Sequence, residues 1–329
     1  MRLPSGPPPS PGERPAGQVL VVMVAGLLLA ALVNADALVE RAQHKALGPG
    51  RDRSLALWHP VQDVAHITQL HRFRQLGDDL IGDGTRGSGD LAASAAEATA
   101  TTVDPDDDRP PELRAPSADD PLRVYIAGDS VVRDAGESFL RLDADDPLLA
   151  ASLHYEIGTG LSRLDVYDWP AALVGDAASQ RAEVVLLMFG GNDAQGIVDP
   201  GGTVHPTVDS PGWREEYGRR VGLVMDALRA EDRLLLWVGQ PPMRDDGFDA
   251  RIAVINDVVA EEAEGRAWVH YVDTRRVLGD ERGRYVERRT DVDGPLRQGD
   301  GIHLSRAGAD LLARHLRRML ADELAGTGR

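Results

Sequence analysis

From residue 121 onward, short runs rich in Val, Leu and aromatic residues alternate with longer segments of helical periodicity. The runs show no polar alternation, which is typical of strands buried on both faces of a sheet. Strands that alternate with helices in this way predict a parallel sheet with helices on both sides. The expected strands cover residues 124–127, 183–189, 233–238 and 268–272, with a further strand-like run at 154–157. The expected helices cover residues 213–230, 250–263 and 305–324, the last with Ser305 as its N-cap.

The first of these strands leads directly into Gly128-Asp129-Ser130, which is followed by a helix-compatible segment. This order places Ser130 on the turn at the carboxyl end of the strand, where open α/β sheets bind their ligands. The first turn of the next helix also offers free backbone N–H groups to an anion. The three residues alone equally fit an ordinary turn and helix cap, so Ser130 becomes a candidate nucleophile only if it has partners.

Asp300-Gly-Ile-His303, immediately before the last expected helix, holds the residue types that a serine nucleophile needs. A serine hydroxyl becomes a good nucleophile when a base takes its proton, and the base needs an acid that fixes its tautomer and stabilises its cation. His303 and Asp300, three residues apart on one turn, can supply both functions. Without Ser130, a capping Asp beside a half-exposed His would be the preferred interpretation.

Two further strand ends offer donors for a negatively charged oxygen. Gly190-Gly191-Asn192-Asp193 follows the most apolar strand, and an Asn amide there suits an oxyanion donor, although a simple Asn-Asp turn explains it equally well. Gly158-Thr159-Gly160 ends the run at 154–157, where a glycine N–H could supply another donor, although glycines after strands are usually turn formers. Together with Ser130 and the Asp300–His303 turn, these segments fall at one edge of the predicted sheet.

In this order, the four segments resemble the SGNH (also called GDSL) hydrolase superfamily over residues 121–325. Its first block resembles Gly128-Asp129-Ser130, its second supplies a glycine matched by Gly160, its third reads Gly190-x-Asn192-Asp193, and its last is matched by Asp300 and His303. Val131 stands where the superfamily usually has Leu, and Gly158 is the alternative match for the second block. The resemblance implies a three-layer SGNH-type (flavodoxin-like) α/β fold, with a parallel sheet flanked by helices.

The resemblance also implies a role for each matched residue. Ser130 would be the nucleophile, His303 the base and then the acid, and Asp300 the group that orients His303. The Ser130 N–H, the Gly160 N–H and the Asn192 amide would form the oxyanion hole, while Asp129 and Asp193 are expected to brace the loops. The remaining candidate histidines have no comparable Asp partner in sequence and are not proposed as the base: His154, His205, His270 and His315. The superfamily needs no metal or organic cofactor, and the sequence contains no ligand cluster or phosphate loop that would demand one.

Residues 159–170, 237–243 and 297–303 resemble a bacterial SGNH subgroup of undefined function, whose members commonly have an N-terminal membrane segment. The leading hypothesis is an exported serine esterase that removes acyl groups from cell-envelope glycans or similar esters. An O-acyltransferase with the same triad would differ only in its acceptor, a sugar hydroxyl in place of water. A third hypothesis is an inactive SGNH-like module that binds glycan or acts as a scaffold, but the intact Ser, His, Asp and Asn argue against it.

Charge and cysteine content exclude several other classes. The formal net charge of −17 argues against a nucleic-acid partner, because phosphate binding needs clustered Lys and Arg. The chain has no cysteine, which excludes disulfides, thiolate metal sites and cysteine nucleophiles. No protein partner can be identified from the sequence.

The first 120 residues differ in composition from the rest. We expect a disordered cytoplasmic tail over 1–17, a membrane anchor or signal segment over 18–34, membrane-proximal helices over 35–82, a flexible linker over 83–120 and the hydrolase domain over 121–329. The uncharged run Val19–Val33 reaches roughly 23 Å at ~1.5 Å per residue, short of the ~30 Å hydrocarbon core.

Two interpretations of this apolar run stay open. Ala35-Asp36-Ala37 has the small-x-small form of a signal-peptide cleavage site, whereas the length of the run and the helical segment after it favour a retained anchor. Both keep Arg2 and Arg14 inside the cell. Both therefore predict that the hydrolase domain is exported, and the anchor would hold it outside a bacterial plasma membrane.

Overall fold

The computed structural model describes residues 16–43, 45, 49–68, 109–144 and 146–326. The chain divides into a smaller unit, residues 1–86, and a larger unit, residues 87–329. Of the tail predicted over 1–17, only Ala16 and Gly17 are described, and both belong to the first helix. Residues 83–108 of the predicted linker lie outside the described residues.

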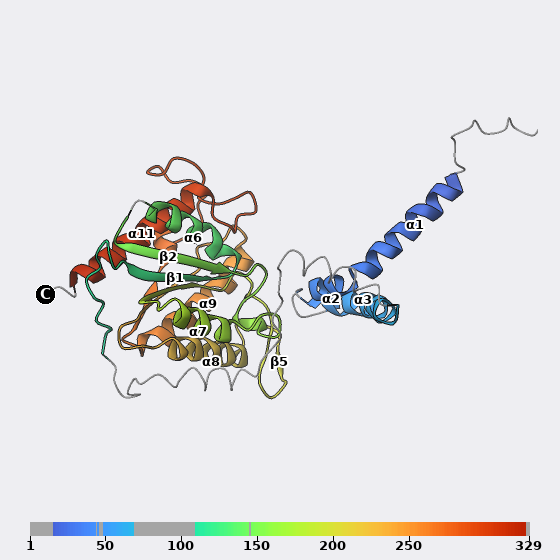
Figure 1. Cartoon of the computed structure of the whole chain (residues 1–329), viewed down its shortest axis with the longest axis horizontal. Helices are drawn as coiled ribbons and strands as arrows, with labels where there is room; N and C mark the ends of the chain where they lie inside the picture. Colours follow the sequence, from blue (N-terminus) through green and yellow to red (C-terminus); the bar gives the residue numbers. More distant parts are fainter. Residues whose placement is uncertain (1–15, 44, 46–48, 69–108, 145, 327–329) are drawn as a thin grey trace, which may run out of the picture. The chain divides into compact units, whose positions relative to one another are not determined.

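A five-stranded parallel sheet forms the centre of the larger unit (Figure 1). Its strands are β1 (Leu122–Gly128), β2 (Leu149–Tyr155), β3 (Val184–Met188), β6 (Leu234–Val238) and β7 (Val269–Val272). They are ordered β2-β1-β3-β6-β7, so the chain reverses its direction of travel across the sheet between β1 and β3. This is the flavodoxin-like order, in which ligands bind at the reversal point.

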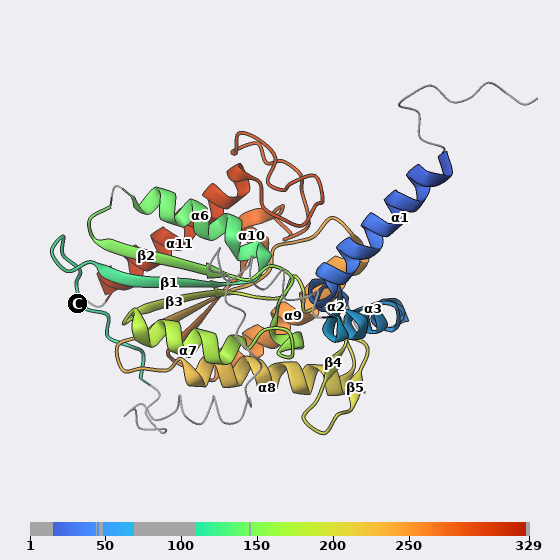
Figure 2. The same ribbon diagram turned by 45° about the vertical axis from the view of Figure 1, so that its right-hand side comes forward.

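Helices cover both faces of this sheet, which confirms the predicted α/β architecture (Figures 1 and 2). One face carries α6 (Ser130–Asp143), α10 (Thr274–Leu278) and α11 (Arg306–Gly326). The other carries α7 (Trp169–Ser179), α8 (Pro211–Ala227) and α9 (Asp246–Glu264). At the start of α11, Ser305 Oγ accepts from the Gly308 N–H at 3.2 Å, as its predicted N-cap role requires.

Residues of one strand alternate between two hydrophobic cores. Val124 and Ile126 of β1 pack with α6 and α11, whereas Tyr125 and Ala127 pack with α7 and its neighbours. Because both faces of the strand are buried over residues 124–127, the sequence shows an unbroken run of Val, Tyr, Ile and Ala there.

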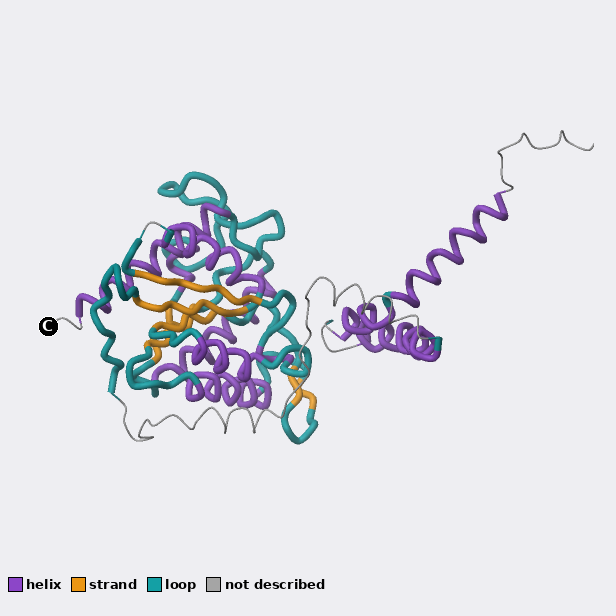
Figure 3. The backbone as a smooth tube through the Cα atoms, viewed as in Figure 1, coloured by secondary structure: helices purple, strands orange, loops and turns teal. Residues whose placement is uncertain are grey.

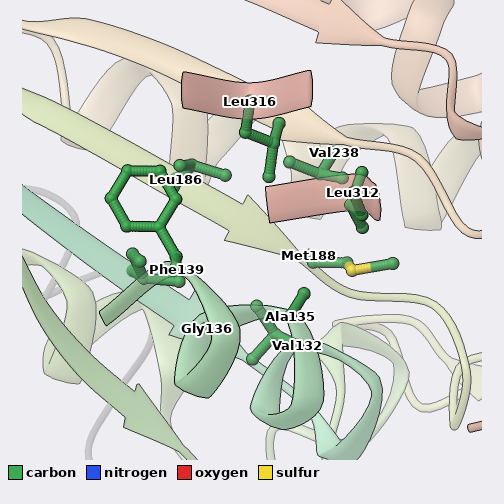
Figure 4. Close-up of a pocket in the computed structure, with 10 residues that line it drawn as sticks. Val132, Ala135, Gly136, Phe139, Leu186, Met188, Val238, Leu312 and Leu316 are labelled. Carbon is green, nitrogen blue, oxygen red and sulfur yellow. The ribbon is translucent and has the colours of Figure 1, made fainter. Parts of the chain in front are cut away.

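A cavity of about 10 Å³ lies in the first of these cores, between the sheet and helices α6 and α11 (Figure 4). A single water needs roughly 10–15 Å³ and polar partners. All the side chains around this cavity are apolar, so we interpret it as a packing gap and not as a ligand site. Its lining residues are Ile126, Val132, Ala135, Gly136, Phe139, Leu186, Met188, Val238, Leu312 and Leu316.

The strand expected at 154–157 was largely misplaced. β2 covers Leu149–Tyr155 and pairs with β1 over its whole length. Its Ala-Ala-Ser centre has weak strand preference, and the segment is a strand because its backbone completes the edge of the sheet. The sequence also did not indicate the short antiparallel pair β4 (Ile197–Val198) and β5 (Val204–His205), nor the 3₁₀ turn η1 (Leu161–Arg163).

The last part of the predicted linker, residues 109–120, packs on the larger unit, so the linker interpretation is wrong there. Leu113 is 6% exposed and belongs to the core of α6 and α11. Arg114 forms an ion pair with the buried Glu183 at 2.6 Å and donates to the Pro121 carbonyl at 2.8 Å. One buried side chain and one ion pair are enough to attach a segment whose composition is otherwise that of a linker.

The smaller unit contains three described helices, α1 (Ala16–Val33), α2 (Ala35–Gln43) and α3 (Pro49–Ile67). Within the region 35–82, helix is therefore found over residues 35–43 and 49–67, and residues 44, 46–48 and 69–82 lie outside the described residues. Helices α2 and α3 contact each other, and Asp36 accepts from Gln62 Nε2 at 2.9 Å and binds His66 Nε2 at 2.8 Å.

The 18 residues of α1 span about 27 Å at ~1.5 Å per residue. Among the described residues, no helix combines the length and apolarity that a membrane crossing requires. The anchor predicted over residues 18–34 is therefore not supported.

The core position of Leu113 can be tested by substitution. Leu113→Ala should lower the free energy of unfolding of the larger unit by about 2–3 kcal/mol, because a buried side chain is truncated and a cavity remains. Urea unfolding followed by tryptophan fluorescence would measure the loss. Glu112→Ala, at the exposed neighbouring position, is the control and should stay within about 0.5 kcal/mol of the original chain. Equal unfolding midpoints for the two variants would show that residues 109–120 are a linker after all.

Candidate active site

Ser130 lies at the carboxyl end of β1, as the first residue of α6, and is 8% exposed. Asp129 is the N-cap of this helix, and its side chain accepts from the Val131 N–H at 2.9 Å. This cap orients the first turn, so the backbone N–H groups at the start of α6 lie beside the Ser130 hydroxyl.

His303 joins Ser130 and Asp300 into one hydrogen-bonded series. His303 Nε2 lies 2.9 Å from Ser130 Oγ, and His303 Nδ1 lies 2.6 Å from Asp300 Oδ2. If the Nδ1 proton is donated to the carboxylate, the lone pair of Nε2 faces the serine hydroxyl and can accept its proton. The structure thus brings Ser130 together with the Asp300–His303 turn, which the sequence placed in a separate loop.

The second oxygen of Asp300 is also bound, since Oδ1 accepts from the backbone N–H groups of Ile302 at 2.9 Å and His303 at 3.1 Å. Partial burial acts to raise the pKa of Asp300, but the bonds from His303 and from the two N–H groups outweigh it and hold the pKa below its usual value. Asp300 is therefore an anion at neutral pH, ready to stabilise a protonated His303.

The long segment that carries Asp300 and His303, residues 279–305, contains no helix and no extended strand (Figure 3). An isolated bridge between Arg297 and Leu304 closes its base, and the Gln298 N–H donates to the His303 carbonyl at 2.8 Å. Gly301 has a φ of +77°, a conformation that favours glycine. The turn from Asp300 to His303 is thus fixed by backbone bonds and a glycine.

Asn192 and Gly160 occupy neighbouring loops. Asn192 Nδ2 donates to the Thr159 carbonyl at 3.0 Å, which links the loop after β3 to the loop after β2. Gly160 is buried, and a Cβ at this position would collide with the Asp193 carboxylate. The close approach of Asp193 therefore requires glycine at 160. Sequence reasoning missed Thr159, whose only signal was its place between two glycines.

Asp129 and Asp193 brace these loops, as predicted. Besides capping α6, Asp129 accepts from the N–H groups of Gly190 at 3.2 Å and Gly191 at 2.9 Å. Asp193 accepts from the Ser162 N–H at 2.7 Å and from the Tyr217 hydroxyl at 2.9 Å. Both carboxylates are completely buried.

The burial of these carboxylates changes their acidity. Burial raises the pKa of Asp129 to about 7, helped by the nearby charge of Asp193 and opposed by the three backbone N–H donors. Burial likewise raises the pKa of Asp193.

The sequence also missed other histidine–carboxylate pairs in the larger unit, among them His154 with Asp176, His205 with Asp199 and His270 with Glu323. His154 Nδ1 lies 2.6 Å from Asp176 Oδ2, and the Tyr125 hydroxyl donates to the same oxygen at 2.8 Å. Asp176 is 22 residues from His154 along the chain, so spacing could not reveal it. No hydrogen bond between this pair and Ser130 is present in the described residues, which leaves His303 as the base in contact with Ser130.

Fold and site together define an α/β protein of flavodoxin-like strand order, with Ser, His and Asp in contact at the strand reversal. The chain belongs to the DUF459 family, described as a protein of unknown function, which it matches over residues 123–319. No curated protein matches the chain.

Similar solved structures include a candidate SGNH hydrolase from Slackia heliotrinireducens, with 18% identity over 61% of this chain and 100% of that chain and a TM-score of 0.43. A variant of Axe2, an acetyl xylan esterase from Geobacillus stearothermophilus, has 18% identity over 62% of this chain and 94% of that chain and a TM-score of 0.43. LAE5, an alpha/beta hydrolase enzyme from the metagenome of Lake Arreo, has 18% identity over 63% of this chain and 95% of that chain and a TM-score of 0.44. At these identities the likeness is one of fold.

The raised pKa of Asp129 predicts that its contribution to stability depends on pH. With a pKa of ~3.9 when unfolded and about 7 when folded, the group binds its proton more tightly in the fold. Its contribution is therefore fully present below about pH 4 and is lost as the pH rises toward 7, by ~1.4 kcal/mol per pH unit. Urea titrations would give the free energy of unfolding of the original chain and of Asp129→Asn. The difference between them, original minus variant, should decrease as the pH is raised from 4.5 to 7.5. A difference that stays constant over this range would contradict the assignment.

Proposed function

We propose that the larger unit is a serine ester hydrolase in which Ser130 is the nucleophile. The observation that carries this proposal is the series of contacts from Asp300 to His303, at 2.6 Å, and from His303 to Ser130, at 2.9 Å. Distances of this length are those of a nucleophile in contact with its base and of a base in contact with its orienting acid.

In the proposed reaction, Ser130 Oγ attacks the acyl carbon while its proton passes to His303 Nε2. Asp300, ionised and bound to Nδ1, stabilises the resulting imidazolium. As the tetrahedral intermediate collapses, His303 gives the proton to the departing alcohol and an acyl-serine remains. Water, deprotonated by His303, then attacks the acyl-serine. As the second tetrahedral intermediate collapses, His303 returns the proton to Ser130 Oγ and the acid is released.

The negative charge on the tetrahedral oxygen needs donors already in place. We propose the N–H groups of Ser130 and Gly160 and the amide of Asn192. Support for Asn192 comes from its bond to the Thr159 carbonyl. Because a carbonyl oxygen can only accept, the amide nitrogen of Asn192, and not its oxygen, must face Thr159. The second hydrogen on the same nitrogen is the proposed donor to the substrate oxygen.

We propose acyl groups on cell-envelope glycans, or similar esters, as the substrates, and an exported hydrolase domain. This part of the proposal rests on the apolar run at residues 19–33 and on the resemblance of residues 159–170, 237–243 and 297–303 to a bacterial subgroup. The reaction needs only the side chains and backbone described above.

An assay with short p-nitrophenyl esters tests the reaction. The purified protein should release p-nitrophenol, and Ser130→Ala should lower the rate by about 10³-fold or more, because the nucleophile is removed. Ser179→Ala, at an exposed serine of α7, is the control and should keep the original rate. Release that requires an added sugar would indicate acyl transfer, and a folded protein that forms no acyl-serine would contradict catalysis.

The Asn192 amide can be tested separately from the triad. Asn192→Ala should lower kcat by about 10²–10³-fold with little change in KM, because the bond strengthens as negative charge develops. Asn256→Ala is a matched control: its amide holds the Gln240 backbone at 2.8 and 2.9 Å, so its loss should lower Tm and leave kcat per folded molecule nearly intact. If Asn192→Ala behaves like this control, Asn192 is a turn residue and not an oxyanion donor.

A further inference from the structure

Arg244 lies against the turn that carries Asp300. Its Nη1 donates to the Gly299 carbonyl at 2.9 Å, and its backbone N–H donates to the Gly301 carbonyl at 3.2 Å. Its Nε donates to the Tyr285 hydroxyl at 3.3 Å. These bonds hold an exposed guanidinium in one place, and none of them uses Nη2.

A series of contacts connects this guanidinium to the proposed nucleophile. It runs through Gly299, to which Arg244 is bound, then through Asp300 and His303 to Ser130. Arg244 also follows β6, the strand next to β3, so it originates from the same edge of the sheet as Asn192. Arg244 and Ser130 therefore contact opposite ends of one turn, residues 299–303.

The positive charge here is not neutralised by an ion pair. In the part of the chain that the structure describes, Glu287 and Asp300 influence Arg244 through their charge, and the hydrogen bonds of its guanidinium go to a hydroxyl and a carbonyl. A second guanidinium, of Arg297, is 2% exposed and lies 6.0 Å from the Tyr285 ring, while that of Arg244 lies 5.9 Å from it.

The Arg297 guanidinium is bound to carbonyls as well, Leu296 at 3.4 Å and Pro242 at 3.1 Å. Burial lowers the pKa of Arg297 to about 10, which leaves it a cation at neutral pH. Burying a charge without a paired carboxylate is costly, so the buried Arg297 beside the exposed Arg244 calls for an explanation beyond stability.

We infer that Arg244, with Arg297 behind it, forms a subsite for a negatively charged group of the ester substrate, most simply a carboxylate. A guanidinium fork with free N–H groups matches a carboxylate in geometry. Because the whole chain carries a net charge of −17, an anionic substrate would be repelled without such a local cation. The inference rests on the proposed hydrolase function and adds a substrate class to it.

Matched ester pairs test this subsite, because the charge can lie on either side of the scissile bond. Monoethyl succinate against ethyl butyrate places the charge in the acyl group, with acid release followed at constant pH. Acetylated glucuronic acid against acetylated glucose places it in the alcohol, with acetate release measured. The protein should prefer the charged member of at least one pair, and the preferred pair identifies the side that Arg244 contacts.

Arg244→Gln should lower the ratio of kcat/KM for the charged ester to that for the neutral ester by about 10–100-fold, the value of a hydrogen bond to a charged group. Arg244→Lys keeps the charge and loses the planar guanidinium. Its ratio should lie between those of the original chain and Arg244→Gln. Arg282→Gln removes the same charge from an exposed position of residues 279–305, the segment that carries Asp300, and should leave the ratio unchanged. Equal melting temperatures would confirm that the variants are folded.

Two results would overturn the subsite. One is an original chain that hydrolyses esters with no preference for the charged members. The other is an Arg244→Gln variant that loses the same factor on both members of a pair, which would mean that Arg244 only holds the turn from Gly299 to Gly301. Failure to hydrolyse any of the four esters would instead contradict the proposed hydrolase function.

Discussion

The Asp129 carboxylate is the interaction on which the arrangement of the site depends. One buried side chain binds the first turn of α6 and the two glycine N–H groups that follow β3. Parallel strands end without a shared hairpin, so the loops after β1 and β3 have no backbone ladder to hold them together. Asp129 supplies that connection, and Asp193 extends it to the loop after β2. Removing a carboxylate at this position would leave several buried N–H donors unsatisfied.

The strand order explains why the site lies here and nowhere else on the sheet. The chain moves outward from β1 to β2 and then returns to the other side of β1 as β3, and this reversal point is where open α/β sheets bind their ligands. Ser130 follows β1, and Asn192 follows β3. Asp300 and His303 reach the same edge from the segment before α11, which packs beside α6. Packing of these two helices therefore brings together residues 173 positions apart, Ser130 and His303.

The central strands and the Asp300–His303 pair were predictable because each depends on local pattern or on short spacing. The contact of His303 with Ser130 was expected because both residues lie in loops at one edge of the predicted sheet. Runs of Val and Leu mark β1, β3 and β6, since burial on both faces requires apolar residues throughout. Asp300 and His303 are three apart and share one turn. By contrast, the Ala-Ala-Ser centre of β2 is a strand only because β1 lies beside it. Leu113, alone in a polar segment, and Asp176, far along the chain from His154, became visible only once the chain was folded.

Gly301 ties the acid–base pair to the cation beside it. Its φ of +77° turns the chain between Asp300 and His303, and a Cβ there would lie 2.5 Å from the Cβ of Arg244. Any side chain at position 301 would therefore both strain the turn and displace Arg244. The contact that holds His303 in line with Ser130 and the contact that fixes the guanidinium share the same three residues, 299–301. Changes in this turn that displace the Arg244 guanidinium, the proposed anion subsite, should for that reason also displace His303, the proposed base, because one short backbone segment fixes both.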